Sequence, residues 1–152
     1  MRVEGAADAP RMGPSHFPHT TEEEPVKLLL TSGGVRNASI HRALLDLLGK
    51  PTADATALCI PTAQWGHPTC GPVSARGFVA GLPPWGGMTS MPWKSLGLLE
   101  LSALATIGEE RWVPWVRAAD VLLVDGGEAT YLCHWMKVSG LADLLPSLSD
   151  TV

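Results

Sequence analysis

The feature that most constrains the fold is the string V-L-L-V-D-G-G-E-A-T-Y-L, which covers residues 121–132. Four consecutive apolar residues are typical of a strand buried on both faces, as strands of parallel sheets are. The acid and two glycines that follow indicate a turn, and the residues beyond them have helical spacing. The string therefore predicts a parallel strand that passes into a helix at the carboxyl edge of an α/β sheet.

The rest of the sequence predicts further elements of the same kind. Apolar runs predict strands over residues 26–30, 57–60 and 96–104. Helical spacing predicts helices over 40–48, 108–118 and 129–139, with another beginning at 141, and small residues favour a short helix over 73–79. Asn37 is the expected cap of the first helix, and Gly49 its end. In the helix over 108–118 we expect Trp112, Trp115 and Val116 to share a face. The strand, helix and strand within residues 26–60 form a βαβ unit, which implies parallel strands.

Two glycine pairs directly follow predicted strands: Ser32-Gly33-Gly34 and Asp125-Gly126-Gly127-Glu128. In open parallel sheets, ligands bind outside the carboxyl ends of the strands. Glycine lacks a Cβ, so the backbone N–H groups of such turns are accessible, and the helix that follows adds partial positive charge. Both turns therefore favour an anion, either a phosphate or the oxyanion of an acyl-transfer intermediate.

Three segments, taken in order, resemble the peptidase E family of aspartyl dipeptidases and cyanophycinase-like serine peptidases: "KLLLTSGGVRNASIHRALLDLL", "ALCIPTA" and "VLLVDGGEATYLCHWMKVSGLADLL". The resemblance covers residues 26–152. It implies a three-layer, doubly wound parallel sheet of the flavodoxin or class I glutamine amidotransferase type, and a hydrolase that needs no cofactor or metal. It also implies that the backbone N–H of Gly126 or Gly127 forms the oxyanion hole.

The expected substrate of the complete protein is a small peptide or amide, and its contacts are assigned to residues near the predicted sheet edge: Ser32, Gly33, Gly34, His67 and Glu128. Glu128 departs from the family pattern, because many members carry Asn after the glycines. A carboxylate there would repel an oxyanion unless it points away or is protonated, and it is equally well explained by interaction with the helix dipole.

The serine nucleophile of the family lies in a Gly-x-Ser-Ala-Gly elbow on the next strand, and no Gly-x-Ser-x-Gly occurs in this sequence. Thr151 and Val152 resemble the first residues of that strand. We therefore expect an N-terminal piece of a peptidase domain, inactive alone, with the catalytic Ser and His beyond residue 152. An open sheet edge would leave such a piece marginally stable, and pairing of that edge with another chain would give an oligomer.

Charge and composition bear on the partners of the protein and on its cellular compartment. The net charge is -4, the sequence pI is about 5.7 and there is no Lys/Arg run, which argues against a nucleic-acid or membrane partner. The odd number of cysteines (Cys59, Cys70 and Cys133) and the lack of a signal sequence predict a cytoplasmic protein with free thiols, Cys59 and Cys133 being buried. Residues 1–25 are predicted to be a disordered tail.

A different class of function is also open. Ser32-Gly33-Gly34 would suit a Rossmann-like module that binds a small molecule or a nucleotide phosphate. Against this alternative, the sequence contains neither G-x-G-x-x-G in its first turn nor G-x-x-x-x-G-K-[ST] anywhere.

Overall fold

The structure is a computed structural model that describes residues 26–152, so the predicted tail over residues 1–25 lies outside the described residues. Three strands are β1 (Thr56–Ile60), β2 (Ser95–Leu98) and β3 (Val121–Val124). The α-helices are α1 (Ala38–Leu48), α2 (Ala63–Gly66), α3 (Pro72–Val79), α4 (Leu101–Leu104), α5 (Glu109–Arg117), α6 (Ala129–Val138) and α7 (Leu141–Leu144). Two short 3-10 turns, η1 and η2, cover Thr52–Asp54 and Leu145–Ser147.

The strands form one parallel sheet in the order β2-β1-β3, with Ala57 opposite Val121 and Thr56 opposite Ser95. The prediction of an α/β fold with a parallel sheet is therefore confirmed. Asp120 fixes the start of β3, because its carboxylate accepts the Thr56 backbone N–H at 2.7 Å and the Lys50 ammonium at 2.8 Å. These bonds tie the amino ends of β1 and β3 together.

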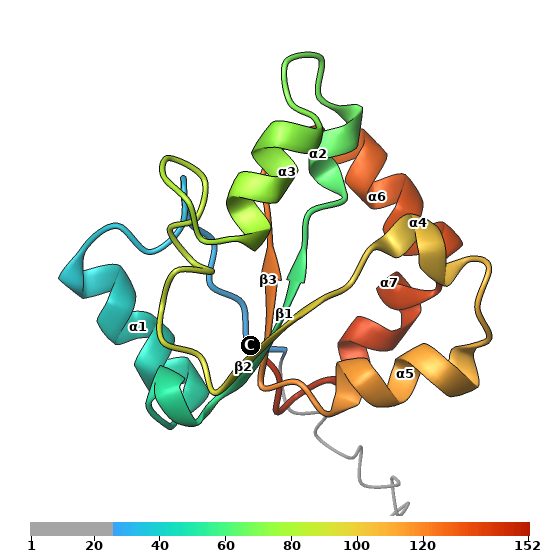
Figure 1. Cartoon of the computed structure of the whole chain (residues 1–152). Coiled ribbons are helices and arrows are strands. Elements are labelled where there is room, and N and C mark those ends of the chain that lie inside the picture. The colour runs from blue at the N-terminus through green and yellow to red at the C-terminus, as the bar shows by residue number, and fades with distance from the viewer. Residues whose placement is uncertain (1–25) are drawn as a thin grey trace, which may run out of the picture.

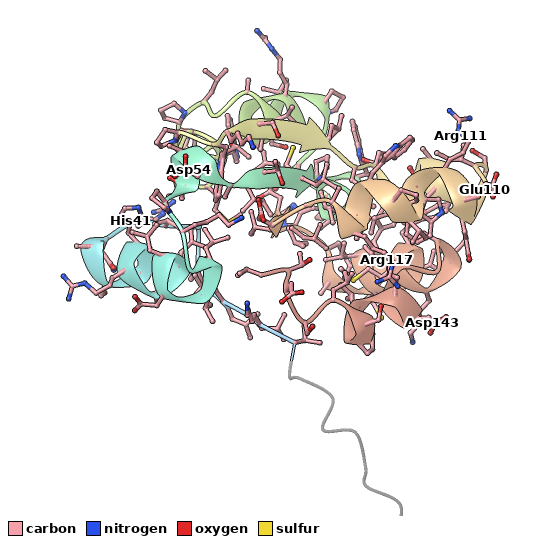
Figure 2. All side chains as sticks on the ribbon, turned by 90° about the horizontal axis from the view of Figure 1, so that it is seen from below. His41, Asp54, Glu110, Arg111, Arg117 and Asp143 are labelled. Carbon is pink, nitrogen blue, oxygen red and sulfur yellow. The ribbon has the colours of Figure 1, made fainter. Side chains whose placement is uncertain are left out.

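Successive residues of the strands pack into two different hydrophobic clusters. Ala57, Cys59 and Leu123 belong to a cluster with α1 and α3, whereas Ile60 belongs to a second cluster with α4, α5 and α7. Figure 1 shows α1 on one side of the sheet and α4, α5 and α7 on the other. Charged side chains such as those of Glu110 and Arg111 point away from this interior (Figure 2). Helices therefore cover both faces of the sheet.

The first predicted helix is confirmed together with its two ends. The Asn37 side chain accepts the Ile40 N–H at 2.9 Å, and Gly49 closes α1 in the left-handed conformation with φ 67°. A capped, amphipathic segment of this kind is specified by local sequence, because its ends and its apolar stripe agree.

Two predicted strands require correction. Residues 26–30 are not a strand: the segment makes no backbone hydrogen bond to any described residue, so its apolar run has no neighbour to pair with. The strand predicted over 96–104 is shorter, because β2 ends at Leu98 and Glu100 then caps α4 through its side chain. The apolar spacing of residues 101–104 belongs to this helical turn and not to the strand.

One prediction of burial was wrong, that of Cys133, and the face predicted for Trp112, Trp115 and Val116 is buried only in part. In α5, Trp112 and Val116 are buried, but Trp115 is 47% exposed, because it lies one residue off the i,i+4 stripe that faces the core. Cys133 is exposed on α6, while Cys59 is buried as predicted in β1. Burial raises the pKa of the Cys59 thiol to about 11.

The backbone of Val152 lies beside β3 on the side opposite β1. Its N–H donates to the Asp120 carbonyl at 3.0 Å, and its carbonyl accepts the Leu122 N–H at 2.9 Å. This pair of bonds to residues on either side of Val121 is the pattern of a parallel ladder. Val152 therefore pairs with β3 in parallel register, on the edge of β3 that faces away from β1.

Candidate functional site

The candidate site lies in the turn between β3 and α6, at the carboxyl edge of the sheet. Two backbone hydrogen bonds fix this turn against the segment that follows β1. The Asp125 N–H donates to the Ile60 carbonyl at 3.0 Å, and the Glu128 N–H donates to the Ala63 carbonyl at 2.9 Å. The turn is thus held at both ends, and the two glycines between them form its exposed tip.

The amides of the two glycines differ in their partners. The Gly126 N–H donates to Oδ1 of the preceding Asp125 at 2.8 Å. The Gly127 N–H has no acceptor among residues 26–152. Because the Glu128 N–H is also bonded, Gly127 carries the one unpaired amide of this turn that the described structure offers to a ligand.

Gly127 is required by its surroundings as well as by its backbone. Its φ is 151°, and a Cβ at this position would overlap the carbonyl oxygen of Ala63. A Cβ on Gly126 would meet open space. The glycine pair therefore consists of one residue that the turn needs and one that it tolerates.

Asp125 is held by a side chain that sequence reasoning missed. The Gln64 Nε2 donates to Asp125 Oδ2, while the Gln64 Oε1 is buried and has no partner in the described structure. Gln64 is 3% exposed, so it is a fixed part of the interior behind the turn. Burial raises the pKa of the Asp125 carboxyl, although the bonds from Gln64 and the Gly126 N–H oppose this.

Glu128 acts as the N-cap of α6. Its carboxylate accepts the backbone N–H groups of Tyr131 and Thr130, and these bonds lower the pKa of the carboxyl. The charge is therefore directed at the helix terminus, as the dipole explanation requires. A contact between Glu128 and substrate stays a prediction.

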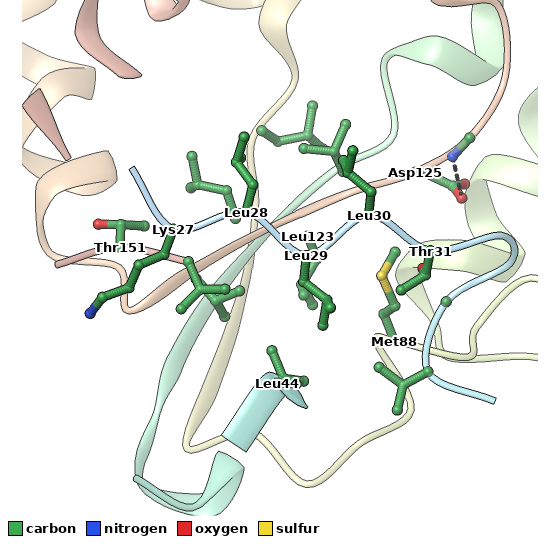
Figure 3. Close-up of a pocket in the computed structure, with 18 of the residues that line it drawn as sticks. Lys27, Leu28, Leu29, Leu30, Thr31, Leu44, Met88, Leu123, Asp125 and Thr151 are labelled. Atoms are coloured by element: carbon green, nitrogen blue, oxygen red, sulfur yellow. Dashed lines mark hydrogen bonds between the residues drawn. The ribbon is translucent and has the colours of Figure 1, made fainter. Parts of the chain in front are cut away.

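A cavity of about 510 Å³ opens beside the turn and brings both glycine turns to one space (Figure 3). Of the predicted substrate contacts, Gly33 and Gly34 line the cavity, together with Asp125 and Gly126 of the other turn. Ser32, Gly127 and Glu128 do not line it, although Ser32 and Gly127 are exposed.

His67 lies apart from this cavity, at the carboxyl end of α2. Its ring Nδ1 accepts the Thr69 backbone N–H at 3.3 Å, and its charge contributes to the lowered pKa of Glu128. His67 is therefore a neighbour of the α6 terminus. His134, the other histidine near the turn, is exposed and packs edge-on against Trp135.

The residues that sequence reasoning missed are Gln64 and Asp125. The sequence contained a signal for Asp125, because an acid directly after a buried strand falls at the ligand-binding edge of a parallel sheet. It contained no signal for Gln64, because the contact of Gln64 with Asp125 depends on how α2 lies against the turn. Gly66 permits this approach, since a Cβ there would overlap the Tyr131 side chain of α6.

The arrangement can supply one hydrogen-bond donor to an anion at the tip of the turn. It also supplies a half-buried carboxyl group on the cavity side, that of Asp125, whose pKa is raised by burial. The described residues hold no cluster of three or more His, Cys, Asp or Glu side chains suited to a metal ion. No helix in the described range is long and apolar enough to cross a membrane.

Comparisons of the chain with models of protein families, with curated proteins and with solved structures gave no match.

Proposed function

We propose that the chain carries the oxyanion-binding part of a serine peptidase-like α/β domain, and that its turn after β3 stabilises the tetrahedral intermediate of acyl transfer. On this proposal the finer fold class is the three-layer, doubly wound sheet of the peptidase E family. The single observation that supports it most is the unpaired, exposed N–H of Gly127 on a turn that is fixed at both ends. A rigidly placed donor of this kind stabilises developing negative charge without having to reorganise.

The sheet supports the proposal at the point where the nucleophile would lie. Val152 pairs with β3 in parallel register, so a strand that ran on in this direction would reach the same edge as Asp125 and Gly126. A serine placed at that end would lie beside the turn. The sequence itself contains no Gly-x-Ser-x-Gly, and we therefore expect the 152-residue chain to hydrolyse no peptide.

Asp125 is the electrostatic difficulty of the proposal, because an ionised carboxylate next to an oxyanion repels it. Its raised pKa lessens this repulsion, since the neutral form is favoured by burial. The Glu128 carboxylate is committed to the Thr130 and Tyr131 amides, which places its charge against the helix terminus. The free thiols of Cys59, Cys70 and Cys133 support the accompanying inference of a reducing, cytoplasmic compartment.

The proposal is tested by extending the chain after Val152 with a strand, a Gly-x-Ser-Ala-Gly elbow and the remaining domain of a peptidase E family member. We expect the extended protein to hydrolyse aspartyl dipeptides, and the unextended chain to leave them intact. Replacing the elbow serine by Ala should abolish the activity and leave the fold unchanged. An extended protein that unfolds cooperatively as a monomer, yet cleaves no dipeptide, would contradict the proposal.

A further inference from the structure

β2 forms the outer edge of the sheet, because in the strand order β2-β1-β3 it pairs with β1 alone. This edge is separate from the position proposed for the nucleophile, since Val152 pairs with β3 at the other end of the sheet. Leu96 and Leu98 of β2 are 37% and 56% exposed, and neither belongs to the two hydrophobic clusters. β2 therefore presents an apolar surface that the described residues leave uncovered.

The backbone of β2 is unpaired along the same edge. The Leu99 N–H donates to the Cys59 carbonyl at 2.9 Å and continues the pairing of β2 with β1. Because alternate residues of a parallel strand direct their backbone groups to the same neighbour, Gly97 faces β1 as Leu99 does. The N–H and C=O groups of Leu96 and Leu98 therefore point to the open edge, where no strand of the described structure pairs with them.

The charges near this edge stand at the two ends of the strand. Exposed edge strands are generally protected against pairing by a charged residue or a proline, and β2, with the sequence Ser-Leu-Gly-Leu, contains neither. Lys94 directly precedes β2 and is exposed, and Glu100 follows it by two residues. The Glu100 carboxylate accepts hydrogen bonds from the uncharged side chains of Thr62 and Trp65. Neither Lys94 nor Glu100 forms an ion pair within the described part of the chain.

The sequence of this edge is self-complementary about Gly97. If two copies of β2 run antiparallel and meet at Gly97, residues at equal distances on either side of it come opposite each other. Leu96 then lies opposite Leu98 of the second copy, and the outward N–H and C=O groups of these two residues pair. Lys94 lies opposite Glu100 of the second copy, so unlike charges meet. A two-fold axis forms each of these pairs twice.

We propose that the chain forms a two-fold symmetric dimer, in which the β2 strands of two copies pair antiparallel about Gly97 and join the two sheets into one. This inference is independent of the proposed hydrolase function, because no residue of the turn after β3 takes part. Main-chain hydrogen bonds at Leu96 and Leu98 hold the two strands together, and burial of these leucines adds an apolar contribution. The pairs of Lys94 with Glu100 select this register, because other registers separate the unlike charges.

Sedimentation velocity of the full chain across a concentration series should show a reversible equilibrium between monomer and dimer. Lys94→Glu places a second carboxylate opposite Glu100, and it should raise the dissociation constant of the dimer about tenfold. Lys137→Glu makes the same change of charge on the exposed surface of α6 and should leave this constant unchanged. Leu98→Lys puts a charge within the paired edge and should raise the constant more than about tenfold. Circular dichroism checks that each variant keeps the fold.

Disulfide trapping tests the register of the two strands. In a background with Cys70 and Cys133 replaced by Ser, Leu96→Cys and Leu98→Cys are oxidised alone and as a mixture. Opposite Cα atoms of a hydrogen-bonded antiparallel pair lie about 5.5 Å apart, within reach of a disulfide, so the mixture should form covalent dimers. Each variant alone should form few, because its two cysteines are offset by two residues along the paired strands.

Three results would overturn the proposal. The first is a chain that stays monomeric at every concentration, which would leave the β2 edge to a different partner. The second is a dimer that Lys94→Glu and Leu98→Lys do not weaken, because its interface would then lie elsewhere. The third is cross-linking of the single cysteine variants to the same extent as their mixture, which would exclude pairing about Gly97.

Discussion

Gly127 carries the strictest local requirement of the candidate site. Its backbone has a φ of 151°, and the Ala63 carbonyl occupies the space where a side chain would begin. Its neighbour Gly126 has neither restriction, although the two residues look alike in the sequence. The two glycines therefore separate the structural need for glycine from its mere presence in a turn.

Substituting each glycine by Ala should give different results. Gly127→Ala should lower the free energy of unfolding by about 1–3 kcal/mol, because it combines a strained φ with overlap at Ala63. Gly126→Ala should change it by less than about 1 kcal/mol, because its Cβ meets open space. Urea unfolding of both variants measures the difference. Equal losses for the two would show that the turn does not have this geometry.

The two aspartates at opposite ends of β3 should respond oppositely to pH. The bond from Lys50 lowers the pKa of Asp120, so its contribution to stability is complete above its unfolded pKa and is lost as pH falls through the folded pKa. Burial raises the pKa of the Asp125 carboxyl, so ionising this group in the folded protein costs stability. The cost is complete at pH values above the pKa of the folded state and absent below the pKa of the unfolded state.

Asparagine variants report these contributions in urea unfolding between about pH 2 and pH 7. Asp120→Asn should destabilise the protein at neutral pH and flatten the loss of stability in acid. Asp125→Asn should be neutral or stabilising at neutral pH and have little effect in acid. If both variants shift the free energy of unfolding in the same direction at neutral pH, the opposite pKa shifts of Asp120 and Asp125 are refuted.

At the scale of elements, apolar periodicity identified β1, β3, α1, α5 and α6, because each has a clear stripe or run with a capping or turn residue at its end. It failed at residues 26–30, where strand formation depends on a neighbour that the sequence pattern cannot supply. It failed again after Leu98, where a four-residue helical turn continues an apolar run without a break. Apolar periodicity could not predict the contact between Gln64 and Asp125, because α2 and β3 meet through tertiary packing.

The two tryptophans of α5 test which face of this helix is buried. Trp112 is 1% exposed, and Trp112→Ala should lower the free energy of unfolding by about 3–5 kcal/mol, because it leaves a large cavity in the second cluster. Trp115 is 47% exposed, so Trp115→Ala should cost less than about 1 kcal/mol. Chemical unfolding followed by circular dichroism compares the two variants. A larger loss of the free energy of unfolding for Trp115→Ala would mean that α5 buries the opposite face.

For the whole molecule, the decisive feature is a sheet that is paired along one edge of β3 and open along most of the other. The sequence predicted the parallel sheet. It could not predict the cavity beside β3, because the cavity is enclosed by residues distant in sequence, such as Leu29, Leu123 and Leu148. Their proximity follows from the assembled layers and not from any local pattern.

The most direct measurement of the central claim is an NMR titration of the ¹⁵N-labelled chain with a dipeptide phosphonate, whose tetrahedral anion imitates the intermediate of acyl transfer. The account predicts a saturable downfield shift of the Gly127 amide proton, with a smaller change at Gly126, whose N–H is already bonded to Asp125. The planar carboxylate of the matching dipeptide should bind more weakly. A Gly127 amide that does not move while the phosphonate binds elsewhere, or does not bind at all, would contradict the account.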